Sequence, residues 1–347
     1  MGNVYTKSGK LAKRLYFGAV LLFEGLYYTF KNRVLADGGT FLENELPTIS
    51  QDASLVLTPN AYKAGKLYSA VPNDGTGDFT VDRNSTATYI DEDGLIKTAL
   101  ANEVRFDWST GVPVILREPQ STNLSIQSNL FSSGSWIKNN VTSFTTSIID
   151  LNGNLSARNL IPSNADIRHD TAQIPTYTIG LDYNHSIYIK YNGNRYFLFS
   201  SLTGGIRFDF NNNTISSIKG SVINSNTEIL NNGWFRISFS FTSNGGERFI
   251  FISSATIIES AFNAYLGDGV SGVLIYGAQL EQGSTATSYI PTDTTTVTRL
   301  ADEISVPTPA GVTSITETID GVEQAPITTI PATYSLPVGN INKITML

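Results

Sequence analysis

The sequence predicts a mainly β protein: a jelly-roll β-sandwich, with a small helical N-terminal anchoring region and a C-terminal β-hairpin region. Composition is the first reason. Hydrophobic residues make up 41% of the 347 residues and charged residues only 15%, so Ser, Thr, Asn and Gly carry the polarity, as suits strands joined by turns. Eighteen Phe and sixteen Tyr can fill a sizeable core. Short β-rich runs also recur at the spacing of roughly 8–12 residues that is typical of sandwiches and jelly rolls.

Residues 1–60 are predicted to form an N-terminal anchoring and oligomerisation region. Apolar residues recur there at steps of three and four, as on one face of a helix, and other apolar residues fill most of the remaining surface. Such a helix needs cover on most sides, which we expect another subunit to supply. The residues expected to anchor it are Leu15, Phe17, Leu22, Phe23 and Leu26.

The same apolar run is predicted neither to act as a signal peptide nor to insert into a membrane. Glu24 interrupts it, no small-residue cleavage site follows, and it is too short and polar for the ~20 apolar residues of a spanning helix. Residues 1–35 hold six basic residues and one acidic residue, Glu24, so their net charge is +5. Because the net charge of the whole chain is −7, the remaining residues carry a net charge of −12. An acidic body of this kind is poorly suited to nucleic acid. The absence of cysteine excludes disulfides and thiolate metal sites.

Residues 61–124 are predicted to form a small β-rich connector. Short strand-like runs are separated there by turns at Asn73–Gly75, Asp93-Gly94 and Thr110-Gly111. Residues 293–347 are predicted to form hairpins, with a turn at Ile319–Glu323. Because isolated hairpins are marginal, we expect them to pack on the sandwich or on a neighbouring chain.

Residues 125–292 are predicted to form the jelly roll. Turn signals at Asn192-Gly193, Asn232-Gly233 and Asn244-Gly245 divide its strands. The run from Trp234 to Phe241 alternates strictly between large apolar residues and mostly polar ones. That period of two predicts one dry face and one wetter face.

Candidate catalytic and metal-binding residues favour structural roles, and we expect no enzyme activity, no metal and no cofactor. His169 and His185 are the only histidines, and no nucleophile motif accompanies them. The acidic residues Asp91, Asp93 and Asp268 lie in turns. They could supply oxygen ligands for calcium, but their spacing matches no known loop, so solvated turns are the simpler interpretation.

An exposed aromatic platform for sugars is the remaining candidate site. Sugar rings stack on aromatic side chains, while Asn and Arg bind hydroxyl groups. Core packing is the default for a Trp or Tyr in a strand. The turn after residue 190 is the exception, and its predicted glycan-binding residues are Tyr191, Asn192, Asn194 and Arg195.

Three segments carry a resemblance to a known group of proteins. They are Lys66–Ile96, Leu116–Leu124 (LREPQSTNL) and Tyr276–Thr292 (YGAQLEQGSTATSYIPT). They resemble segments of virion structural proteins of tailed bacteriophages, including those of crAss-like phages, whose third unit is similar to carbohydrate-binding jelly rolls. Such segments occur in head fibres, tail fibres and decoration proteins, and the resemblance implies no particular catalytic residues.

The resemblance implies a head-fibre-like appendage, or a tail fibre, on the exterior of the virion, assembled in the cytoplasm of a bacterial host. We expect its N-terminal region to bind capsid or tail proteins as a homodimer or homotrimer, and its sandwich to bind host surface glycan. Two alternatives remain open: an architectural capsid decoration protein and a polysaccharide-degrading enzyme.

Overall fold

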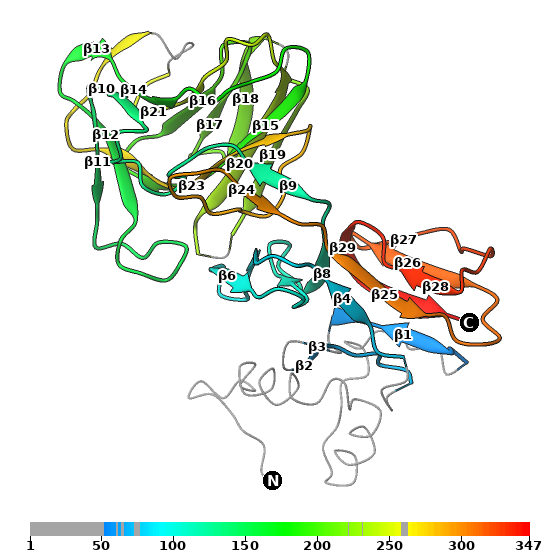
Figure 1. Cartoon of the computed structure of the whole chain (residues 1–347). Coiled ribbons are helices and arrows are strands. Elements are labelled where there is room, and N and C mark those ends of the chain that lie inside the picture. The colour runs from blue at the N-terminus through cyan, green and yellow to red at the C-terminus, as the bar shows by residue number, and fades with distance from the viewer. Residues whose placement is uncertain are drawn as a thin grey trace, which may run out of the picture.

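The computed structural model describes residues 52–59, 62–63, 66–72, 77–220, 222–230, 232–257 and 263–347. Every regular element in these ranges is a β-strand, which confirms the predicted fold class (Figure 1). No helix within them has the length and apolarity of a membrane crossing. The helix expected in residues 1–60 and its anchoring residues Leu15, Phe17, Leu22, Phe23 and Leu26 lie outside the described residues.

The sandwich consists of two antiparallel sheets with six strands each. The order of the first sheet is β10 (Ile137–Asn139), β14 (Asp170–Gln173), β21 (Phe249–Ser254), β16 (Tyr196–Ser200), β17 (Gly204–Asp209) and β18 (Thr214–Gly220). The order of the second sheet is β11 (Val141–Thr145), β12 (Arg158–Pro162), β23 (Gly272–Gln282), β15 (Asp182–Asn192), β20 (Phe235–Thr242) and β19 (Asn224–Ile229). A small pair, β13 (Asp166–Arg168) and β22 (Ala264–Leu266), lies beside them.

The core between the two sheets is aromatic. Phe197, Phe199 and Phe251 come from the first sheet, and Phe239 and Phe241 from the second, and all are fully buried. Alternate residues of each strand point into this layer, as the period of two in the sequence predicts. The predicted turn at Asn192-Gly193 joins β15 to β16, where Gly193 takes φ +107°.

The prediction of a wetter face on β20 is wrong. Arg236, Ser238 and Ser240 alternate with the core residues but are at most 6% exposed. The outer face of the second sheet is covered by a second hydrophobic cluster that includes Ile90 and Ile96, which come from the hairpin formed by β5 (Ala87–Ile90) and β6 (Ile96–Ala99). The central strands β15, β20 and β23 of the second sheet are therefore buried on both sides, which a strand pattern alone could not show.

The remaining strands form a second lobe, which we call the foot lobe (Figure 1). One of its sheets has the order β27 (Val322–Glu323), β26 (Ile315–Ile319), β29 (Gly339–Met346), β8 (Val114–Arg117) and β7 (Phe106–Asp107), and β1 (Leu55–Leu57) also pairs with β29. A second has the order β28 (Thr333–Ser335), β25 (Glu303–Pro307) and β4 (Thr80–Asp82). The short pair β2 (Tyr62–Lys63) and β3 (Lys66–Leu67) lies nearby in sequence.

The predicted connector and tail share one structure. A connector strand pairs with a tail strand in each foot sheet, β8 with β29 and β4 with β25. One cluster of buried residues is their common core, and Leu55 and Leu57, from the end of the predicted N-terminal region, belong to it as well. The tail thus pairs with the connector rather than with the sandwich. Its predicted turn is present, because Asp320 and Gly321 both take positive φ (51° and 77°), as two-residue hairpin loops require.

The sandwich is consequently an insertion between two halves of the foot lobe. The chain leaves the foot along β9 (Ser121–Asn123) and returns along β24 (Val297–Arg299), and these two strands pair with each other antiparallel. Entry and exit of the inserted domain are thereby held side by side.

Candidate functional site

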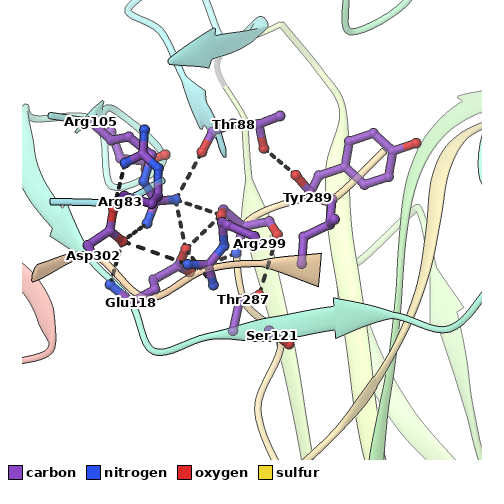
Figure 2. A network of polar contacts seen from close by, with 12 residues as sticks. Arg83, Thr88, Arg105, Glu118, Ser121, Thr287, Tyr289, Arg299 and Asp302 are labelled. Carbon is purple, nitrogen blue, oxygen red and sulfur yellow. Dashed lines mark hydrogen bonds and ion pairs between the residues drawn. The ribbon is translucent and has the colours of Figure 1, made fainter. Parts of the chain in front are cut away.

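A buried charged cluster, which we call the joint, lies where the sandwich meets the foot lobe (Figure 2). Three arginines and two carboxylates form its centre. They are Arg83, Arg105 and Arg299 with Glu118 and Asp302. Each arginine side chain is at most 1% exposed. The five residues come from four separate parts of the chain, so the joint exists only in the folded protein.

Asp302 holds the foot side of the joint together. One of its carboxylate oxygens accepts a hydrogen bond from Arg83 Nη1 at 2.6 Å, and the other accepts from Arg105 Nη2 and from the backbone N–H of Glu118, the latter at 2.9 Å. Arg83 also donates to the carbonyl of Leu100 at 2.7 Å. A carboxylate with donors on both oxygens is fully satisfied, as burial requires.

Glu118 links this cluster to the sandwich. Its carboxylate accepts hydrogen bonds from the backbone N–H and the hydroxyl of Ser288 at 2.7 and 2.6 Å, and from Arg105 at 2.8 Å. Arg299 lies 3.4 Å away. Burial alone would raise the pKa of Glu118, but the charges of Arg105 and Arg299 outweigh burial and lower it to about 2. Glu118 is therefore charged at any physiological pH.

Glu281 and Gln279, on the last strand of the sandwich, hold the segment that follows it. Glu281 accepts hydrogen bonds from Ser121 Oγ (2.6 Å) and from the backbone N–H of Thr287 (2.9 Å). The Gln279 side chain accepts from the N–H of Ile290 at 2.6 Å and donates to the carbonyls of Thr287 and Ser288. These side chains are nearly inaccessible, at 1% and 0% exposure, so the segment 287–290 is fixed against the outer face of β23.

Asn123 ties β9, the strand along which the chain enters the sandwich, to β23 and to the segment 287–290. Its amide nitrogen donates to the carbonyls of Ala278 (3.2 Å) and Ile290 (2.8 Å), and its oxygen accepts from the N–H groups of Ser125 (3.0 Å) and Leu280 (3.1 Å). The side chain is fully buried. One amide therefore joins strand β9, strand β23 and the segment after β23.

A hydrophobic contact completes the joint. Tyr188, Trp234 and Tyr276 on the outer face of the second sheet pack with Tyr289 and with the hairpin residue Ile90. Thr88 of the same hairpin donates a hydrogen bond to the carbonyl of Tyr289 (Figure 2). Removing one partner of a buried charged cluster is costly, because the remaining charge stays buried without compensation. The joint links the sandwich to the foot lobe through buried ion pairs, hydrogen bonds and this apolar contact.

The predicted glycan-binding residues separate into exposed and buried ones. Tyr191 is 55% exposed, and Arg195 is partly exposed and paired with Asp209 through two hydrogen bonds of 2.9 and 2.7 Å. Asn192 is half-buried beside them. The assignment of Asn194 needs correction: it is 2% exposed, and its amide bonds Ser253 Oγ at 2.8 Å, so it supports the turn from inside.

The two histidines have structural surroundings. His185 lies within the aromatic core, accepts or donates one hydrogen bond with Tyr177 at 2.9 Å, and burial lowers its pKa well below the ordinary value. His169 packs on Tyr265, with ring centroids 4.6 Å apart, its Nε2 lies 3.0 Å from the hydroxyl oxygen of Ser163, and burial likewise lowers its pKa. Enclosed imidazoles that pack on aromatic rings fit structural roles.

The candidate calcium ligands stabilise turns. Asp91 accepts from the N–H groups of Asp93 and Leu95, and Asp268 from those of Val270 and Ser271. Within the described ranges, no three acidic or histidine side chains converge as a metal site would need. Side chains that accept from nearby N–H groups act here as turn caps.

Sequence reasoning missed the joint, although several of its residues lie in the segments that carry the resemblance, while Arg105, Arg299 and Asp302 lie outside them. Arg83 and Thr88 belong to the first segment, Glu118 to the second, and Tyr289 to the third. The sequence did hold an indication, because all three segments resemble the same class of proteins although they lie up to 200 positions apart in the chain. Only the fold shows that they meet.

The fold and the joint define a two-lobed β protein with an inserted sandwich. No protein-family model matches the chain, and no curated protein matches it. Among solved structures, it is similar to the CBM22-1 and GH10 modules of Clostridium thermocellum endo-1,4-β-D-xylanase 10B in complex with xylohexaose. The identity is 12%, the match covers 51% of this chain and 30% of the other, and the TM-score is 0.27. The chain thus matches less than a third of that protein's length, and a likeness this weak supports no conclusion about the function of this chain.

Proposed function

We propose that this chain is a structural subunit of a tailed-bacteriophage virion, a head-fibre-like or tail-fibre appendage that displays its sandwich for attachment to host surface glycan. One observation carries the proposal. The three segments that resemble virion proteins contribute side chains to one buried joint: Arg83 from the first, Glu118 from the second and Ser288 from the third. If the sequence segments shared with virion proteins form the contact between the two lobes, that contact suits a protein that holds a displayed domain in a fixed direction.

The connectivity supports an arrangement with one attached end and one displayed end. Strand β1 pairs with β29 of the foot lobe, and the N–H of Ser54 donates to the carbonyl of Met346 at 2.8 Å. The chain before residue 52 therefore joins the protein at the foot. Anchoring through residues 1–51 would leave the inserted sandwich on the far side of the joint, where many copies on one particle gain avidity, often 10²–10⁴-fold.

Immunogold electron microscopy tests this proposal. Antibodies raised against residues 125–292 are applied to purified phage particles from cells that express the chain. The proposal expects gold at one constant distance outside the capsid or the tail. Particles that carry no label, with the chain recovered only in the soluble fraction, would refute it.

A further inference from the structure

The end of the sandwich opposite the joint carries a second candidate site. On β15, Tyr183 pairs with Gln282 near the joint, whereas Tyr191 pairs with Val273 at the other end. Eight positions of extended strand separate them, or about 26 Å at ~3.3 Å per residue. Three turns meet near Tyr191, at residues 192–195, 209–213 and 268–271. We call this region the rim.

Tyr191 is the aromatic feature of the rim. Of the aromatic side chains whose exposure is described, it is the only one with more than half of its surface exposed. Its ring contacts Phe210 edge to face, with centroids 5.8 Å apart and an interplanar angle of 67°. This contact holds the ring in place from one side and leaves a flat apolar surface available to a ligand.

Asp209 organises the polar part of the rim. Besides Arg195, it accepts hydrogen bonds from the N–H of Asn211 at 3.0 Å and from the side-chain amide of Asn212 at 3.1 Å. The guanidinium of Arg195 also lies over the ring of Tyr196, 4.8 Å from its centroid. Both Nε and Nη2 of Arg195 are engaged by Asp209, so its plane is fixed while Nη1 takes no part in that pair.

The rim is held in shape before any ligand arrives. Gly193 takes φ +107°, and a Cβ at this position would lie 2.9 Å from the Cβ of Ser271. Asn194 adds hydrogen bonds from its backbone N–H to the carbonyl of Gly272 (3.0 Å) and from its side chain to that of Ser271 (3.2 Å). A preformed site loses less entropy when it binds.

We infer that the rim binds a neutral pyranose of a surface polysaccharide, with one sugar face on Tyr191 and its hydroxyls on Arg195 and the neighbouring Asn side chains. The charges favour a neutral sugar over an acidic one. The charged residues of the three turns are Arg195, Asp209 and Asp268, so the rim holds no excess of positive charge to attract an acidic sugar. Fixed donors beside a flat apolar surface match the hydroxyl groups and C–H face of a sugar. The inference rests on the glycan attachment proposed above and names its site.

Binding of the full chain to defined oligosaccharides tests the inference. The probes are glucose-, galactose- and mannose-based oligosaccharides, with sialylated and uronic-acid oligosaccharides as the acidic set. We expect binding to at least one neutral probe that changes less than 2-fold between 50 and 500 mM salt, because no net charge is neutralised. Tyr191→Ala should weaken it more than 10-fold, and Tyr191→Phe should keep it, since the ring makes the contact.

Ile229→Ala is the matched control, because Ile229 is 60% exposed on the edge strand β19 and should not affect binding. Unchanged melting temperatures show that the variants are folded. Equal binding by Tyr191→Ala, salt-sensitive binding of acidic probes alone, or no binding by the unaltered chain would overturn the inference. Any of these outcomes together with labelled particles would leave the appendage role standing, so the two failures are distinguishable.

Discussion

Asp302→Asn tests the joint most sharply among single substitutions. It keeps the size of a side chain that is 1% exposed and removes its charge. The new amide nitrogen would also face arginine donors, since Arg83 and Arg105 both point at this carboxylate. Two buried guanidiniums would thereby lose their shared counter-ion.

The expected cost follows from these contacts. Removing one partner of a buried ion pair costs about 3–5 kcal/mol, because the remaining charge stays buried without compensation. Glu118 stays beside Arg105 at 2.8 Å and compensates part of the charge. Arg83 keeps only its carbonyl partners, Ser85 and Leu100. We therefore expect a loss near the lower end, about 3 kcal/mol of unfolding free energy.

Urea denaturation followed by tryptophan fluorescence and circular dichroism measures this loss. The matched control is Glu303→Gln, one residue away, where the side chain is 60% exposed and paired with Arg117. An exposed pair of this kind contributes at most about 1 kcal/mol. If Asp302→Asn costs no more than Glu303→Gln, the joint does not hold the two lobes together and the reasoning fails.

Three further predictions concern the joint and the anchor. The pKa of Glu118 is about 2 when folded, below its ordinary 4.5, so its stabilisation is present above pH 4.5 and is lost as pH falls towards 2. The loss is about 3 kcal/mol at ~1.4 kcal/mol per pH unit, and acid titration of Glu118→Gln should lack this component. Asn123→Ala leaves two N–H groups and two carbonyls without their hydrogen-bond partner, so it should lower the free energy of unfolding in urea by about 3 kcal/mol. The control Thr122→Ala should lower it by less than ~1 kcal/mol, and equal losses would contradict the role given to Asn123. Deletion of residues 1–40 should leave a soluble, folded sandwich that no longer joins particles, and normal incorporation, measured by immunoblotting of purified virions, would refute N-terminal anchoring.

The fold class was predictable because strand periodicity is a local property. The alternation from Trp234 to Phe241 correctly predicts β20, and Asp320-Gly321 correctly predicts the hairpin of β26 and β27. What covers a strand is not local. Arg236 is buried because the carbonyl of Thr287 and the hydroxyl of Ser186, each about 50 positions away, lie against it.

The site was less predictable for the same reason. Arg83 and Asp302 look like surface charges in sequence, and only their contact across 219 positions shows otherwise. Asn194 illustrates the opposite error: it lies in a polar turn that suggests exposure, yet Ser253 and Ser271 enclose its amide. Tyr191, by contrast, is exposed as its place in that turn predicts.

The central structural claim is that the joint holds the sandwich and the foot lobe in one orientation. A spin–spin distance measurement tests it directly, because the chain has no cysteine and two introduced ones are labelled uniquely. Ser216→Cys on β18 and Val322→Cys on β27 place labels at exposed positions of the two lobes. We predict one narrow distance peak, which broadens when Asp302→Asn is added. A broad distribution without that substitution would contradict it.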